Sequence, residues 1–248
     1  MNRLEKVWRD LTSRKYRMDF FNDGLGVTNR ELGFLADKKF VDAWNKAVLL
    51  NQEGWSKRKR VPDIRWRAHV CCWAAQHGLG IEGDFVECGV HTGLLSLTVC
   101  NFLDFAKYRK QFYLFDTFAG IPLDGLSKDE TKDAIEYNNI LYFDVLEFAK
   151  RNFSEFPNAH LVPGKLPGSI AQVNIERIAY LSIDLNNATA EQKSIEALWP
   201  KVTPGACIVL DDYAHKGCRP QYDMWNEFAR QQGSSILTLP TGQGLIVR

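Results

Sequence analysis

From residue 83 to the end of the chain, short apolar runs alternate with segments of helical periodicity. Each run is apolar at consecutive positions, which is the pattern of strands buried on both faces of a parallel sheet. The predicted strands cover residues 84–90, 111–118, 160–164, 178–185, 206–212, 235–239 and 244–248, and the predicted helices cover about 94–107, 133–153, 188–199 and 218–232. The alternation predicts an α/β fold with a doubly wound, mostly parallel sheet of seven strands.

The first 82 residues are more charged, and their apolar positions recur at helical spacing. One helix is predicted over residues 40–50 and another over residues 63–78. Thr28 stands three residues before Glu31, as in a capping box, so a further helix start is expected there. This part of the chain is therefore predicted to be helical.

The change of pattern divides the chain into a helical N-terminal extension, residues 1–82, and a main domain, residues 83–248. The extension is rich in Trp and Phe on its predicted helical faces. Apolar faces that a domain does not bury itself commonly mark contacts between molecules. We therefore expect the extension to cover one side of the functional site and to help form a homo-oligomer.

Composition excludes several classes of protein. The chain of 248 residues is 45% hydrophobic, which is enough for a core, and its 31 Lys and Arg balance 30 Asp and Glu. This balance gives no support to a general nucleic-acid binder. No apolar run is long enough to span a membrane, and the first residues lack the apolar region of a signal peptide.

Cysteine usage bears on the compartment. The chain has six cysteines, and no two of them form a C-x-x-C pair of the kind that binds zinc or exchanges disulfides. Several lie in apolar runs, where a free cysteine behaves as a small hydrophobe. We expect a reducing, cytoplasmic environment.

Carboxylates stand at the ends of four predicted strands. They are Glu87, Asp116, Asp184 and the pair Asp211 and Asp212. Parallel strands bring their carboxyl ends to one edge of a sheet, which is where such folds bind ligands. Close carboxylates repel one another unless cations or hydroxyl groups offset their charge, so this edge is the predicted functional site.

The first of these strands leads into a turn with Gly89 and Gly93 at its ends. Glycine permits a tight turn and a close approach of the backbone to a ligand. The turn departs from the G-x-G-x-x-G pattern, which disfavours a dinucleotide site. Asp116 ends the next strand and is predicted to accept hydrogen bonds from the ribose of a nucleoside; the alternative is a helix cap or turn residue.

Asp184, Asp211 and Asp212 come from neighbouring strand ends. Carboxylates with water and substrate oxygens suit a hard divalent ion such as Mg²⁺. The alternative is that these side chains cap a helix or bind the backbone. Residue types alone do not decide between the two.

Four segments together resemble the macrocin-type O-methyltransferases. They are residues 87–93, 115–122, 210–213 and 239–246, and the resemblance extends over about residues 63–248. It implies the Rossmann-like fold of class I S-adenosylmethionine (SAM) enzymes, often assisted by Mg²⁺, that methylate sugar hydroxyls. It also implies that Glu87, Gly89 and Asp116 hold SAM and that Asp184, Asp211 and Asp212 hold the metal.

Other residues at the same strand ends are expected to share these roles. His91, Thr92 and Gly93 belong to the glycine turn, and Thr117 follows Asp116, so we place all four in the cofactor site. A sugar hydroxyl needs a base or a cation beside it, because an alcohol is a poor nucleophile at neutral pH. Asp184, His215 and His91 are the candidate bases, and Asp184 and His215 are the catalytic residues we predict.

The acceptor is less defined than the cofactor. After Asp184 the chain reads Leu-Asn-Asn-Ala-Thr, whereas sugar-antibiotic members of the family commonly carry an acidic and an aromatic residue there. The expected acceptor is a sugar or nucleotide-sugar, as part of a polysaccharide precursor or a glycosylated natural product. Two other classes stay open, a metal-dependent hydrolase that uses the Asp cluster and a non-catalytic binding protein that keeps the fold.

Overall fold

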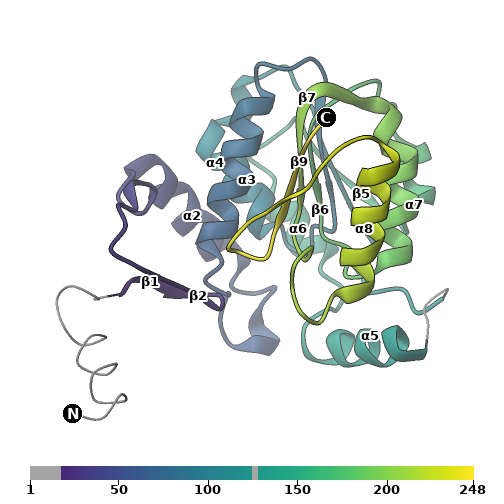
Figure 1. Cartoon of the computed structure of the whole chain (residues 1–248). Helices are drawn as coiled ribbons and strands as arrows, with labels where there is room; N and C mark the ends of the chain where they lie inside the picture. Colours follow the sequence, from purple (N-terminus) through teal and green to yellow (C-terminus); the bar gives the residue numbers. More distant parts are fainter. Residues whose placement is uncertain (1–17, 125–127) are drawn as a thin grey trace, which may run out of the picture.

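The computed structural model describes residues 18–124 and 128–248, and a twisted sheet runs through its centre (Figure 1). The order of the strands in this sheet is β5-β4-β3-β6-β7-β9-β8. The strands are β3 (Asp84–Cys88), β4 (Phe112–Asp116), β5 (Ala159–Pro163), β6 (Ile178–Ile183), β7 (Val202–Leu210), β8 (Leu237–Thr238) and β9 (Gly244–Val247). Strands β3 to β7 pair in parallel, and β9 is antiparallel to both of its neighbours. The predicted seven-stranded, mostly parallel sheet is confirmed.

Helices cover both faces of the sheet, as Figure 1 shows. The α-helices are α2 (Lys38–Asn51), α3 (Arg65–Gly78), α4 (Leu94–Leu103), α5 (Lys128–Ile140), α6 (Leu146–Asn152), α7 (Ala188–Leu198) and α8 (Arg219–Gln231). Short 3₁₀ turns are η2 (Gly33–Leu35), η3 (Ser56–Arg58), η4 (Phe105–Lys107), η5 (Gly168–Gln172) and η6 (Trp199–Lys201). In the described part of the chain, no helix combines the length and the apolar composition needed to cross a membrane.

Each face of the sheet carries its own buried core, because neighbouring residues of a strand point to opposite sides. Phe85 of β3 packs with Phe112 and Tyr180 against α3 and α4. On the other face, the adjacent Val86 belongs to the core that Trp225 of α8 shares with α7. The consecutive apolar positions of these strands are thus explained by burial on both sides.

The strand order fixes where a ligand can bind. From β3 the chain proceeds to β4 and β5 on one side, and then returns to β6 on the other side of β3. The chain therefore turns in opposite directions after β3 and β6, which leaves a crevice beyond their carboxyl ends. In Figure 1 this end of the sheet is the lower one, where α5 and the β1–β2 hairpin also lie.

The beginning of the described chain is not helical as expected. Strands β1 (Met18–Asn22) and β2 (Leu25–Thr28) form a separate antiparallel hairpin. Its two-residue turn, Asp23-Gly24, has φ of 55° and 72°, which is the Asp-Gly geometry that matches the twist of a hairpin. The helix start predicted at Thr28 is wrong, because Thr28 ends β2. The part of the prediction that concerns residues 1–17 lies outside the described residues.

Helices α2 and α3 agree with the sequence prediction, but they do not form a separate layer. Both contribute to the same core as α4, and Phe40 and Trp44 of α2 are buried there. The boundary proposed at residue 82 therefore does not coincide with a break in packing. Among the described residues of this part, Phe21 and Trp73 remain 67% and 52% exposed, and oligomer formation stays a prediction.

The helix predicted over residues 133–153 is two helices. Helix α5 ends at Ile140, α6 begins at Leu146, and the amide of Val145 between them donates to the carbonyl of Phe118 at 2.8 Å. This contact turns the chain back toward the end of β4. It places Leu141, Tyr142 and Phe143 beside the crevice.

A buried hydrogen bond joins the two helices on the Trp225 face. The indole Nε1 of Trp225 donates to Glu191 Oε2 at 2.6 Å, and both side chains are buried. Burial raises the pKa of Glu191 to about 8, and the nearby Asp212 adds to the effect. Glu191 therefore binds a proton in the folded chain at a pH where the unfolded chain has released it.

This shift predicts a pH-dependent stability. The contribution of Glu191 is complete below its ordinary pKa of about 4.5 and is lost as the pH rises through about 8. Glu191→Gln should therefore flatten the fall in unfolding free energy between pH 5 and 8, by up to about 1.4 kcal/mol per pH unit. Denaturant unfolding over this range measures the effect, with the exposed Glu196→Gln on the same helix as control. Equal slopes for Glu191→Gln and wild type would contradict it.

Candidate active site

A cavity of about 620 Å³ opens at the carboxyl ends of β3, β4, β6 and β7. Two sets of predicted residues line it. On the side of β3 and β4 are Glu87, Gly89, His91, Asp116 and Thr117, and on the side of β6 and β7 are Asp184, Asp211, Asp212 and His215. The fold thus brings nine of the eleven predicted site residues to one cavity.

The other two, Thr92 and Gly93, do not line the cavity. Thr92 is fully buried, its hydroxyl donates to Asn51 Oδ1, and its carbonyl accepts from Asn152 Nδ2 at 2.9 Å. Gly93 precedes α4 with φ of 91°, and a Cβ there would lie 2.4 Å from the ring of Phe153. These two residues therefore fix the glycine turn on the side that faces away from the cavity.

Gly89, at the end of β3, packs on the backbone of Asp184, at the end of β6. Its φ is 91°, and a Cβ at this position would lie 1.8 Å from the carbonyl oxygen of Asp184. The turn after β3 therefore packs directly on the backbone at the end of β6, with no room for a side chain. This contact sets the position of Asp184 relative to the turn.

Asp116 organises the same turn from the end of β4. Its Oδ2 accepts from the amides of Val90 and His91 at 2.6 and 2.7 Å, and its Oδ1 accepts from the amide of Phe118 at 2.7 Å. The Thr117 hydroxyl also lies 3.4 Å from Oδ1, but its single hydrogen has a closer acceptor in the Gly120 carbonyl at 2.6 Å. A carboxylate offers about four acceptor positions, so Oδ1 keeps one for a ligand hydroxyl. Asp116 therefore has the turn role that the sequence left as an alternative, and the ribose role stays a prediction.

Buried polar atoms on the β3 and β4 side of the cavity have no hydrogen-bond partner among the described residues. They include Glu87 Oε2, His91 Nε2 and Trp55 Nε1. Burial raises the pKa of Glu87 to about 8 and lowers the pKa of His91 to about 4, so both side chains are uncharged at neutral pH. Since unpartnered polar atoms are costly to bury, this set indicates a polar ligand.

Three acidic side chains converge at the ends of β6 and β7. Burial and the charges of Asp211 and Asp212 raise the pKa of Asp184 well above its ordinary value. Burial and Asp211 likewise raise the pKa of Asp212 to about 6. The site therefore favours either a bound proton or a cation at these carboxylates.

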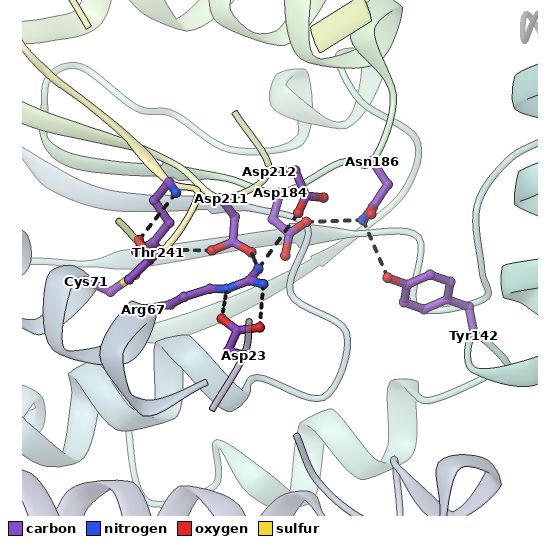
Figure 2. Close-up of polar contacts among 10 residues, drawn as sticks. Asp23, Arg67, Cys71, Tyr142, Asp184, Asn186, Asp211, Asp212 and Thr241 are labelled. Carbon is purple, nitrogen blue, oxygen red and sulfur yellow. Dashed lines mark hydrogen bonds and ion pairs between the residues drawn. The ribbon is translucent and has the colours of Figure 1, made fainter. Parts of the chain in front are cut away.

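Arg67 of α3 lies among these carboxylates (Figure 2). Its Nε and Nη2 donate to both oxygens of Asp23 at 2.6 and 2.8 Å, and its Nη1 donates to Asp211 Oδ2 at 2.6 Å. The same Nη1 lies 3.8 Å from Asp212 Oδ1. One guanidinium thus joins the hairpin to the end of β7, and we call the chain of contacts Asp23–Arg67–Asp211 the arginine bridge.

The three predicted metal ligands are not equivalent. The second oxygen of Asp211 accepts from Gln243 Nε2 at 3.0 Å, so both oxygens of Asp211 have protein partners. Asp184 accepts from Asn186 Nδ2 at 3.1 Å, and the Asp212 carboxylate has the longer contact with Arg67 at 3.8 Å. Within residues 18–124 and 128–248, no three His, Cys, Asp or Glu side chains form a cluster suited to a metal ion.

Several cavity residues were missed from the sequence. Asp23 and Arg67 are far from the strand ends, and only a hairpin signal at Asp23-Gly24 was available. Gln243, which donates to Asp211 but does not line the cavity, lies in the segment 239–246, to which the sequence assigns no role. Tyr142 reaches the cavity because the helix over residues 133–153 is interrupted.

Comparison with known proteins identifies a family and a fold. A family model described as macrocin-O-methyltransferase (TylF) matches residues 65–235. This range begins at α3 and contains the glycine turn and the aspartates Asp184, Asp211 and Asp212. It ends just before β8.

Curated relatives have antibiotic-pathway names. The chain is 26% identical over 148 residues to 8-demethyl-8-(2,3-dimethoxy-alpha-L-rhamnosyl)-tetracenomycin-C 4'-O-methyltransferase of Streptomyces olivaceus, with 56% of each chain covered. It is 27% identical over 178 residues to demethyldecarbamoylnovobiocin O-methyltransferase of Streptomyces niveus, covering 68% of this chain and 65% of the relative. The match therefore spans between half and two thirds of these relatives.

Solved structures agree on the architecture. The O-methyltransferase NovP superposes with a TM-score of 0.68 over 88% of this chain and 99% of that chain, at 19% identity. The SAH-bound methyltransferase PaMTH1 of Podospora anserina superposes with a TM-score of 0.53 at 13% identity, over 90% of this chain and 99% of that chain. At these identities the likeness supports the fold.

The contact between Gly89 and Asp184 makes a direct prediction. Gly89→Ala should lower the unfolding free energy by about 1–3 kcal/mol through the positive φ alone, and more where the backbone of Asp184 must move. Thermal or denaturant unfolding measures the loss. Gly168→Ala is the matched control, because Gly168 has no atoms within 4 Å of an added Cβ. Similar stability of the two variants would show that the turn does not require glycine.

Proposed function

The chain belongs to the macrocin-O-methyltransferase family, and from this we propose that it is a SAM-dependent O-methyltransferase that acts on a sugar hydroxyl. One observation carries the proposal. A single cavity joins the glycine turn of β3, with its unpartnered polar atoms, to the acidic strand ends of β6 and β7. A cofactor on the first side and an acceptor on the second would meet at Asp184.

The cofactor side suits the polar parts of SAM. Gly89 leaves the backbone open, and the unpartnered atoms Glu87 Oε2 and His91 Nε2 offer groups for the amino and carboxylate ends of a methionine moiety. Burial keeps Glu87 uncharged at neutral pH, and a cationic amino group beside it would favour its ionised form. The remaining acceptor position of Asp116 suits a ribose hydroxyl.

When bound, SAM supplies a methyl group on a good leaving group, and the chain has to place and deprotonate the acceptor oxygen. Asp184 is the base that we propose for the site without a cation, because it lies beside the glycine turn and its raised pKa makes it a stronger base than an ordinary carboxylate. A cation held by the same carboxylate would lower this pKa, and the proton would then pass to a second group. His215, whose Nε2 is buried without a partner among the described residues, is the second candidate.

The residues also fit a divalent cation, although in a narrower way than the sequence predicted. Asp184 and Asp212 are oxygen donors whose pKa values are raised by burial first and then by neighbouring carboxylates. We propose that these two carboxylates hold Mg²⁺, and that Asp211 is not a ligand because it is bound to Arg67. A cation there would lower the pKa of the acceptor hydroxyl.

The acceptor is proposed from the names of the relatives. The tetracenomycin relative is named for a rhamnosyl compound, and another structural neighbour is described as a TDP-rhamnose 3'-O-methyltransferase. We propose a sugar, carried as a nucleotide-sugar, a polysaccharide precursor or a glycosylated natural product. No contact of the described residues favours hydrolysis, and we propose no second function.

Cofactor binding is the first test. S-adenosylhomocysteine (SAH) should bind the wild-type chain, and Asp116→Ala should weaken it by about 1–3 kcal/mol through loss of a buried polar partner. Titration calorimetry measures this, with Asp104→Ala, at the exposed end of α4, as control. Unchanged affinity in a folded Asp116→Ala chain would remove the ribose role. No binding to wild type would favour the non-catalytic alternative.

The second test separates the aspartates. With SAH present, Mn²⁺ should bind the wild-type chain, and Asp184→Asn or Asp212→Asn should weaken it at least tenfold, because each removes a ligand oxygen. Asp211→Asn should change the affinity less than threefold. Electron paramagnetic resonance of free Mn²⁺ reports the binding without any need for turnover. An equal loss in all three variants would restore Asp211 as a ligand.

A further inference from the structure

The β1–β2 hairpin is outside the main sheet, yet its tip lies in the cavity. Asp23 occupies the first position of the two-residue turn, and its side chain is 18% exposed. It lines the cavity together with Arg67, Asp211, Asp212 and Cys218. The hairpin thus reaches the side of the cavity that contains Asp184, Asp211 and Asp212, which we call the acidic half. The proposed function places the acceptor there.

The arginine bridge is the contact that holds this tip. Asp23 receives two parallel hydrogen bonds from the fork of Arg67, which fixes direction as well as distance. The Arg67 side chain is 12% exposed and that of Asp211 only 5%, so solvent screens these pairs little. The third bond, to Asp211, anchors the fork to the end of β7.

The other contacts of the hairpin hold its strands and not the side chain at its tip. Phe20 packs edge-to-face on Trp66 at 5.3 Å, and Asn22 donates to Asp63 at 2.8 Å on the surface. Phe21, between them, is 67% exposed. These contacts attach the hairpin to the start of α3, but the side chain at its tip is held by the bridge.

We propose that Arg67 is a positioning residue, which fixes the tip of the β1–β2 hairpin as a wall of the acceptor half of the cavity. That this half of the cavity holds the acceptor rests on the proposed function, whereas the position of the hairpin tip as a wall of the cavity does not depend on it. Without the bridge, the tip would be free to leave Asp211, and the acidic half would be open to solvent on that side. The hairpin is then the element that limits which acceptors can approach Asp184.

Cys218 provides a probe of this wall. It lines the same half of the cavity and is the only cysteine of the chain that is not fully buried. Burial and then Asp212 raise the pKa of its thiol to about 12, so wild type should react slowly with a neutral maleimide. Its rate of modification reports access to the acidic half.

The experiment measures N-ethylmaleimide modification of Cys218 by mass spectrometry in four variants. Asp23→Asn and Arg67→Lys should each react at least fivefold faster than wild type, because the tip is no longer held by a bidentate contact. Arg67→Lys keeps the positive charge, so a faster rate reflects access rather than a changed thiolate fraction. Asp23→Glu keeps a carboxylate and should return the rate toward that of wild type.

Arg230→Lys is the matched control. Arg230 makes a bidentate pair with Glu227 on α8, and this pair is exposed and outside the cavity lining. Its variant should react like wild type. Wild-type rates in Asp23→Asn and Arg67→Lys, or an equal acceleration in Arg230→Lys, would overturn the proposal.

SAH titration of the same variants keeps the two proposals apart. The cofactor half does not include the bridge, so each variant should bind SAH within threefold of wild type and unfold cooperatively. If wild type fails to bind SAH, the proposed function fails while the Cys218 rates still test the wall. If SAH binds and the rates do not change, the wall fails and the proposed function stands.

Discussion

Negative charge in a poorly solvated crevice is the constraint on which the rest of the site depends. The parallel sheet delivers carboxylates from β3, β4, β6 and β7 to one edge, and burial there disfavours their ionised forms. The chain manages this charge in three ways. Asp116 accepts hydrogen bonds from backbone amides. Asp211 accepts from the guanidinium of Arg67 and the side-chain amide of Gln243. Asp184 and Asp212 keep raised pKa values. Similar residues thereby acquire different chemistry from their partners.

The strands of the sheet were predictable because their signal is local and strong. Strand β6, Ile178–Ile183, is buried at every position and apolar at all of them except Ser182, and Asp184 follows it at the carboxyl edge. The same pattern predicts Gly89 and Asp184 at one edge of the sheet. It does not show that the two backbones pack so closely that a Cβ on Gly89 would lie 1.8 Å from the carbonyl oxygen of Asp184, since this depends on how β3 and β6 pair.

The errors have physical reasons of the same kind. The start of the described chain was expected to be helical because Thr28 and Glu31 have capping-box spacing, whereas the Asp-Gly pair before them favours a hairpin turn. Arg67 looked like one more charged residue on a helix. Its role appears only when α3 packs on the sheet and brings it within 2.6 Å of residues 44 positions before it and 144 positions after it. Periodicity carries no information about such distant pairs.

The independence of the hairpin from the main sheet has a consequence for how this scaffold can diversify. Its two strands hydrogen-bond only to each other among the described strands. Loops and small appended units tolerate insertions better than strands inside a shared ladder, where a one-residue slip inverts every side chain. A change in hairpin length or twist would therefore reshape the mouth of the cavity while the register of β3, β6 and β7 stays intact. Under the role that we propose for the hairpin, the limit on the acceptor and the frame of the site lie in separable pieces of the chain.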